Sequence, residues 1–194
     1  MKSVSDIFDM LDGWMNFPNY QLERRADIYF ARYLPLIFEK RFGETVSHSQ
    51  IIPEFPLKKE PSRHSAKVDY AVFCKETVYL VELKTNMLSR SPVQDRYLNK
   101  ATKTPLPKLI DNIRAISTKT KQKTKYKFLL DRLNDLGATD KSIGAQILLV
   151  YIQPQNPEND KNTVTFDEVT NYLSGINDPT AKRFCQSLHL WQNA

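Results

Sequence analysis

The chain has 194 residues, of which 41% are hydrophobic and 26% are charged, a composition typical of one folded domain rather than a disordered or low-complexity chain. Its 28 basic and 22 acidic residues give a net charge of +6, which favours polyanionic partners without selecting DNA, RNA or anionic lipid. The two cysteines, Cys74 and Cys185, are too few for a four-cysteine zinc site or a cysteine-ligated iron–sulfur cluster, so a metal would need mainly oxygen ligands.

The sequence has no segment typical of a membrane span. No run approaches the roughly 18 to 20 apolar residues that a bilayer requires, and the N-terminus MKSVSDIFDMLDGW carries acidic residues where a signal peptide would be apolar. We therefore expect a cytoplasmic protein without a membrane partner.

The first predicted elements are helices. Apolar residues recur at helical spacing over 4–11, and Gly13 is expected to end that helix. A period near 3.6 then continues over 18–42, which predicts the longest helix of the chain, with a kink at Pro35.

Strands are predicted next. Segment 49–58 contains two prolines, so it is expected to be an edge or irregular strand. Segments 67–74 and 77–84 are rich in Val, Tyr and Phe and flank the dipeptide Lys75-Glu76, which predicts a β-hairpin. Both segments are nearly continuously apolar, so we expect both faces of the sheet to be covered.

The rest of the chain is predicted to alternate between helices and one more strand. Helices are expected over 92–103, with Ser91 as N-cap, and over 108–117, 126–136, 166–173 and 179–191, and a strand over 145–153. The helical crossover before that strand favours its parallel addition to the sheet.

These elements predict an α/β fold with a central mixed β-sheet and flanking helices in a single domain over 1–194. The core is expected at about 18–153, followed by a C-terminal helical extension at about 163–194.

Two carboxylates are predicted to face each other across the hairpin. If Lys75-Glu76 closes it symmetrically, paired positions sum to 151, so that Asp69 lies opposite Glu82. A three- or five-residue loop would shift this pairing by one. Lys84, two residues after Glu82, is expected on the same face.

Two opposed acids beside an ammonium form a site of recognisable chemistry. Carboxylate oxygens are the ligands that Mg2+ or Mn2+ prefers, and an ammonium can stabilise the negative charge that develops in phosphodiester hydrolysis. The residues alone therefore predict a metal-dependent phosphodiesterase, whereas an ordinary salt-bridged strand face is the structural alternative.

The same residues carry a resemblance. Asp69, twelve intervening residues and then Glu82-Leu83-Lys84 resemble the D…ExK core of the PD-(D/E)XK nuclease superfamily, although Val68 replaces the usual proline before the first acid. The order of predicted elements from Pro18 to Gln153 is similar to the restriction-endonuclease-like core of that superfamily. The resemblance implies that Asp69, Glu82 and the Leu83 carbonyl bind Mg2+ or Mn2+, while Lys84 orients or activates the attacking water.

Further site residues are implied by the resemblance. Gln94 and Tyr97 lie one helical turn apart and resemble the QxxxY-type motif of RecB-like and lambda-exonuclease-like members, with spacing one residue shorter. Many members place another acid on the first core helix, where Glu23 and Asp27 share a face, and either could join the metal site. An ordinary solvated helix surface remains the alternative for both acids.

Five lysines alternate within nine residues, and we expect them in one connection between two predicted helices: Lys119, Lys121, Lys123, Lys125 and Lys127. Such a concentration of charge attracts a phosphate backbone. With only Tyr126 among the lysines, base stacking is not expected.

The function predicted from the sequence is a Mg2+- or Mn2+-dependent nuclease that acts on nucleic acid, with DNA as the expected substrate. Two alternatives stay open, namely a non-catalytic nucleic-acid-binding or assembly module with a nuclease-like fold and an unrelated α/β interaction protein. Homo-oligomer formation and a separate motor protein as partner also stay open, because the chain has no phosphate-binding G-x-x-x-x-G-K-[ST] motif of its own.

Overall fold

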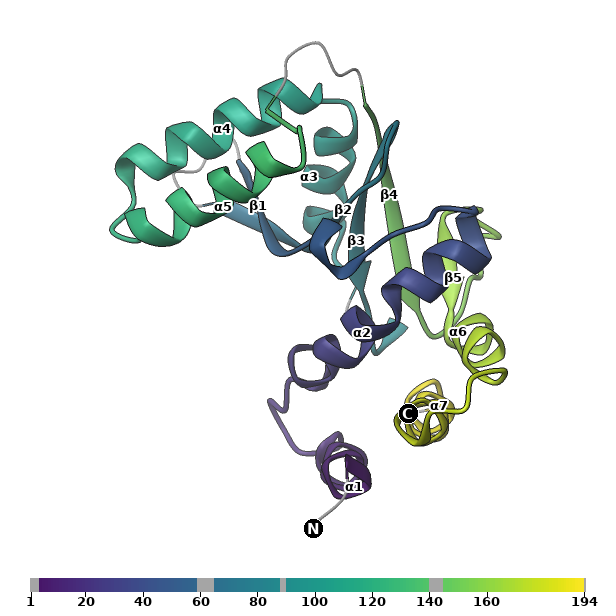
Figure 1. Ribbon diagram of the computed structural model, residues 1–194. Coiled ribbons are helices and arrows are strands. Elements are labelled where there is room, and N and C mark those ends of the chain that lie inside the picture. The colour runs from purple at the N-terminus through teal and green to yellow at the C-terminus, as the bar shows by residue number, and fades with distance from the viewer. Residues whose placement is uncertain (1–3, 59–64, 88–89, 140–144, 194) are drawn as a thin grey trace. The chain divides into compact units, whose positions relative to one another are not determined.

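The computed structural model describes residues 4–58, 65–87, 90–139 and 145–193 (Figure 1). By their contacts these residues form two compact units. The first comprises the segments up to residue 48, 83–90 and 150 onward, and the second comprises 49–82 and 91–149. Among the described residues, no helix is both long enough and apolar enough to cross a membrane.

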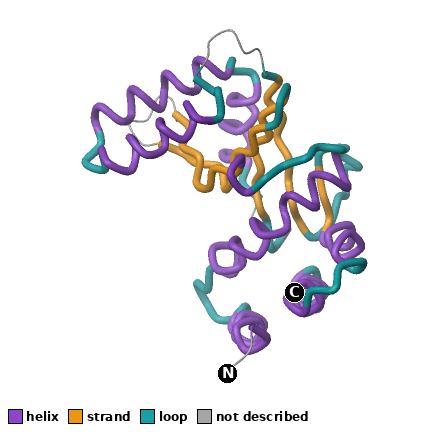
Figure 2. The backbone as a smooth tube through the Cα atoms, viewed as in Figure 1, coloured by secondary structure: helices purple, strands orange, loops and turns teal. Residues whose placement is uncertain are grey.

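The strands, drawn in orange in Figure 2, pair in the order β1-β2-β3-β4-β5. β1 (Ile51–Lys58), β2 (Ser65–Phe73) and β3 (Thr77–Leu83) are antiparallel neighbours, and β4 (Gln146–Gln153) pairs in parallel with β5 (Thr163–Thr165). The expected α/β fold with a mixed sheet and flanking helices is therefore confirmed. β5 was not predicted, because three residues are too few to show a strand period.

The second unit holds the antiparallel strands and three helices, α3 (Pro92–Thr102), α4 (Leu106–Lys119) and α5 (Lys123–Asp135). β1 lies at the edge of the sheet, as its prolines predicted. α4 packs against both β1 and α5. β3 is buried on both faces, as its continuous apolar character predicted.

The hairpin has the predicted register. Ala71 pairs with Leu80 and Tyr70 pairs with Val81, so paired positions sum to 151, and the Cys74 N–H donates to the Thr77 carbonyl at 2.9 Å. The register continued by one residue places Asp69 opposite Glu82.

The first unit is built around helices, namely α1 (Val4–Trp14), α2 (Leu22–Phe42), α6 (Phe166–Leu173) and α7 (Pro179–Trp191). α7 packs against α1 and α6, and α6 packs against α2. Asp12 on α1 accepts hydrogen bonds from the Arg183 guanidinium, the Ser187 hydroxyl and the Trp191 indole of α7. The predicted C-terminal helices have the predicted bounds.

Several predicted boundaries are wrong. α1 continues through Gly13, because a glycine inside a helix costs only about 1 kcal/mol and does not by itself end one. α2 begins at Leu22 rather than Pro18, and Gly43, with φ 70°, ends it. Ser91 is the N-cap residue of α3, but its side chain makes no capping hydrogen bond.

The lysine-rich segment is also not one connection. Lys119 ends α4, and Lys123, Lys125 and Lys127 all lie on α5, with only Lys121 in the short turn between them. The prediction failed because lysine is a good helix former, so a run of lysines does not mark a loop. Lys123 and Lys127, four residues apart, share a face of α5, whereas Lys125 between them points in another direction, so the five lysines do not form one surface.

Candidate functional site

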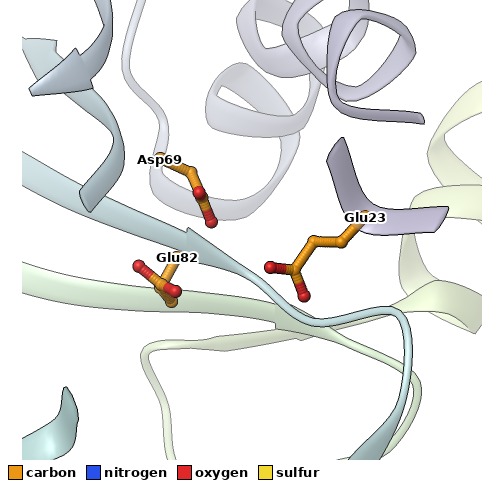
Figure 3. Close-up of side chains that lie close together, drawn as sticks. All are labelled: Glu23, Asp69 and Glu82. Atoms are coloured by element: carbon orange, nitrogen blue, oxygen red, sulfur yellow. The ribbon is translucent and has the colours of Figure 1, made fainter. Parts of the chain in front are cut away.

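The second unit brings Asp69 and Glu82 together. Asp69 lies on β2 and Glu82 on β3, and a carboxylate oxygen of each lies within 4.8 Å of one from the other (Figure 3). Glu82 is buried, with 2% of its surface exposed, whereas Asp69 is half-buried. The predicted opposition of these two acids is therefore present within this unit.

Gln94 contacts this pair. The residue lies near the beginning of α3, and its Nε2 donates a hydrogen bond to Oε1 of Glu82. A carboxamide donor here holds the Glu82 carboxylate in one orientation while leaving its charge in place. The sequence-predicted link between α3 and the acidic pair is thus made by Gln94.

Tyr97 lies one turn further along α3 and has a different contact. Its hydroxyl lies 3.5 Å from the carbonyl oxygen of Lys67, two residues before Asp69 on β2. At this distance the contact is long for a hydrogen bond, and it places the Tyr97 hydroxyl beside the backbone of the strand that carries Asp69.

Lys84 lies in the first unit, directly after β3. Its side chain is 4% exposed, and Nζ lies 3.6 Å from Oε1 of Glu23 on α2. The Lys84 N–H donates to the Ile152 carbonyl of β4 at 2.8 Å, which holds this backbone in extended conformation at the end of the strand. Burial of an ammonium is costly unless an anion is close, and Glu23 supplies that anion.

The two candidate acids on α2, Glu23 and Asp27, make different contacts. Glu23, which Figure 3 labels as a third carboxylate, forms the ion pair with Lys84. Asp27 is half-buried and accepts the N–H of Ile28 at 2.6 Å.

The first unit also has a polar cavity at the beginning of α2. Its volume is about 410 Å³, and its lining includes Glu23, Arg24, Thr85 and Asn86. Thr85 and Asn86 directly follow Lys84 along the chain, so the cavity lies beside the Glu23–Lys84 ion pair. Its lining carries one carboxylate, Glu23, and one guanidinium, Arg24, beside neutral polar groups.

Sequence reasoning missed Gln153, the last residue of β4. It is 1% exposed, its Nε2 donates to the Gln155 carbonyl at 2.6 Å, and its Oε1 makes no hydrogen bond to any described residue. The bond from the Lys84 N–H to the Ile152 carbonyl makes Gln153 the ladder neighbour of Lys84. A polar residue that closes the apolar run 146–153 was the only sequence signal for it.

The donor set fits a hard divalent cation. Two carboxylates whose oxygens lie within 4.8 Å can both approach one ion with small side-chain rotations, because Mg2+ holds its oxygen ligands at about 2.1 Å. Neither cysteine belongs to the pair. The lysines predicted to bind nucleic acid are distant in sequence from these two carboxylates. They lie on α4, on α5 or in the turn between them: Lys119, Lys121, Lys123, Lys125 and Lys127.

Comparisons of the chain with models of protein families, with curated proteins and with solved structures find no match.

Proposed function

We propose that the chain is a nuclease, a Mg2+- or Mn2+-dependent phosphodiesterase that hydrolyses nucleic acid, with DNA as the expected substrate. The observation that carries this proposal is the opposition of Asp69 and Glu82 on β2 and β3, with Gln94 donating to Glu82. Like-charged side chains directly opposite each other destabilise a sheet, and a bound cation removes that repulsion.

Asp69 and Glu82 would hold the ion, with the Leu83 carbonyl as a further oxygen ligand. When bound, the ion supplies a Lewis acid toward a phosphoryl oxygen. Gln94 keeps the Glu82 carboxylate oriented through its Nε2 hydrogen bond. Tyr97 supports the β2 backbone two residues before Asp69.

Lys84 acts as the cationic residue of the proposed site. It follows Glu82 by two residues in extended chain, and side chains at that spacing point to the same side. Its ammonium would donate hydrogen bonds to the attacking water and to the phosphoryl oxygens as their negative charge grows. Glu23 keeps this ammonium oriented before substrate binds, since the two form an ion pair at 3.6 Å.

We further propose Glu23, rather than Asp27, as the helix acid of the site. The ion pair with Lys84 connects Glu23 to the cationic residue of the proposed site. Glu23 also lines the polar cavity at the beginning of α2.

Cleavage assays on labelled single- and double-stranded DNA and RNA test the proposal. Asp69→Asn and Glu82→Gln should lose both Mn2+ binding, measured by calorimetry, and cleavage. Lys84→Ala should retain most Mn2+ binding but lose cleavage by about a hundredfold or more, as expected for removal of one donor to a developing oxyanion. Glu76→Gln, an exposed acid at the hairpin turn, is the control and should match the parent.

Two outcomes contradict the proposal. One is unchanged cleavage by Lys84→Ala and Glu82→Gln in Mg2+ or Mn2+. The other is a parent protein that binds these nucleic acids but neither binds Mn2+ nor cleaves any of the four substrates, which would identify a non-catalytic binding module instead.

A further inference from the structure

The second unit has a groove between the edge strand β1 and helix α5. Its volume is about 500 Å³, which suits a small ligand or one to two residues of a chain molecule. Both elements contribute residues to the lining of the groove. β1 provides Ile52 and Pro53, and α5 provides Lys125, Tyr126, Phe128 and Arg132.

The charged side chains of this groove are mainly cations. Lys125 and Arg132 come from α5 and Lys67 from β2, while the acid in the lining, Glu54, already pairs with Lys67. The Arg132 guanidinium donates to the Ser49 carbonyl at 2.6 Å, which holds it at the beginning of β1. The groove is therefore complementary to an anion of extended shape.

An aromatic ring is exposed among these cations. Phe128 is 73% exposed, an unusual position for a phenyl ring, and Tyr126 beside it is half-buried. Lys125, Phe128 and Arg132 are spaced by three and four residues, so they share one face of α5. Cations beside an exposed ring are the combination that binds a phosphate backbone and stacks an unpaired base.

The edge strand does not suit a peptide that adds to the sheet. Pro53 and Pro56 have no N–H to donate, and Glu54 between them has a left-handed backbone with φ 51°. Strand addition depends on an uninterrupted row of main-chain donors and acceptors, and β1 lacks one.

We propose that the groove between β1 and α5 binds an unpaired nucleic-acid strand, with a base stacked on Phe128 and phosphates against Lys125 and Arg132. The strand is unpaired because base faces inside a duplex are covered by their neighbours and cannot stack on a ring. This inference rests on the proposed function for its ligand class, and it specifies a substrate with a single-stranded segment, such as a frayed end, a flap or a gap.

The structure separates the lysines of α5 into two groups. Lys125 lines the groove, whereas Lys127 pairs with Asp131 at 2.6 Å and Lys123 does not line the groove. Lys123→Gln is therefore a matched control for Lys125→Gln, since both remove one charge from the same helix.

Fluorescence anisotropy with a labelled 12-nucleotide dT strand, the matching rU strand and a blunt DNA duplex tests the proposal, in buffer without divalent cations so that cleavage does not interfere. Phe128→Ala should weaken binding of the single strands by at least about fivefold, the effect of losing one stacked base. Lys125→Gln should make the salt dependence of binding less steep by about 0.7 in log–log slope, and Lys123→Gln should change it less. The parent should bind either single strand more tightly than the duplex.

Any of three results overturns the proposal. Phe128→Ala binds the single strands as tightly as the parent does, Lys125→Gln and Lys123→Gln change the salt dependence equally, or the parent binds the duplex more tightly than the single strands. Loss of self-association on Phe128→Ala, with binding unchanged, would instead show that the ring contacts a second copy of the chain. Cleavage by the parent together with normal binding by Phe128→Ala refutes the groove but not the nuclease. Groove-dependent binding without Mn2+-dependent cleavage refutes the nuclease alone.

Discussion

Gln94 donates a hydrogen bond from its Nε2 to Oε1 of Glu82, so a helix that follows the hairpin orients one of the two opposed carboxylates. Residues that orient a metal-ligating carboxylate generally matter almost as much as the ligand itself. The contact therefore ties the beginning of α3 to the chemistry proposed for the strand pair.

The first prediction follows from this contact. Gln94→Ala should weaken Mn2+ binding or cleavage by about tenfold to a hundredfold, because Glu82 loses the donor that orients it. Asn99→Ala changes an exposed side chain on the same helix and should behave as the parent does. Calorimetry with Mn2+ and cleavage rates measure the two effects, and equal behaviour of both variants would refute a role for Gln94.

The second prediction concerns the stability of the acidic pair. In metal-free buffer, Asp69→Asn and Glu82→Gln should unfold at the same temperature as the parent or higher, because each removes one charge from an opposed pair. Mn2+ at a hundred times its dissociation constant should raise the melting temperature of the parent by about 5 °C or more, but not that of the variants. A parent whose melting temperature ignores Mn2+ has no such metal site.

The third prediction concerns pH and Asp178 in the first unit. Burial acts to raise the pKa of this carboxyl, but hydrogen bonds from Tyr33, from the Thr180 N–H and from Arg32 outweigh it and hold the pKa below the ordinary value of 3.8. A depressed folded-state pKa stabilises the fold above the ordinary pKa, and this contribution disappears as pH falls through the lower folded value.

Asp178→Asn should therefore lower the free energy of unfolding at pH 7. It should also reduce the part of that free energy that the protein loses as pH falls below 5. Urea unfolding at a series of pH values measures this. Glu39→Gln changes an exposed side chain on α2, and this control should match the parent. Parallel pH profiles for the parent and Asp178→Asn would show that the hydrogen bonds do not stabilise the charged form.

The fourth prediction separates two acids that share one arginine. Asp12 is 12% exposed and accepts from Arg183, Ser187 and Trp191, whereas Asp9 is 64% exposed and contacts Arg183 at 2.7 Å. Asp12→Ala leaves buried donors without their acceptor and should lower the free energy of unfolding by about 3 kcal/mol. Asp9→Ala removes an exposed pair and should cost less than about 1 kcal/mol. Denaturant titration compares the two, and equal losses would contradict the burial argument.

Local pattern was enough for much of the fold. The hairpin register followed from a two-residue turn and two β-rich segments, because antiparallel pairing of adjacent strands is determined within a few residues of the turn. The bounds of the C-terminal helices were also predicted, and the structure shows local features that fix them: Pro179 stands at the beginning of α7, and the Thr165 and Glu168 side chains form a capping box at the beginning of α6.

The site was predicted in part for the same reason. Asp69 and Glu82 are neighbours through the hairpin, so chain spacing alone placed them together. The ion pair between Glu23 and Lys84 joins residues far apart in the chain, and only packing within the first unit decides it. Gln153 is a neighbour of Lys84 through the register of β3 and β4; the helical crossover predicted their parallel direction, but no local signal specifies the register.

The sequence by itself predicted that the hairpin brings Asp69 and Glu82 opposite each other, because that relationship depends on residue type and short spacing. Only the tertiary structure decided that Lys125 shares a groove with Phe128 and Arg132 and that β1 forms the other wall. These relationships depend on how helices pack against the edge of a sheet, and packing is determined by long-range contacts that periodicity does not encode.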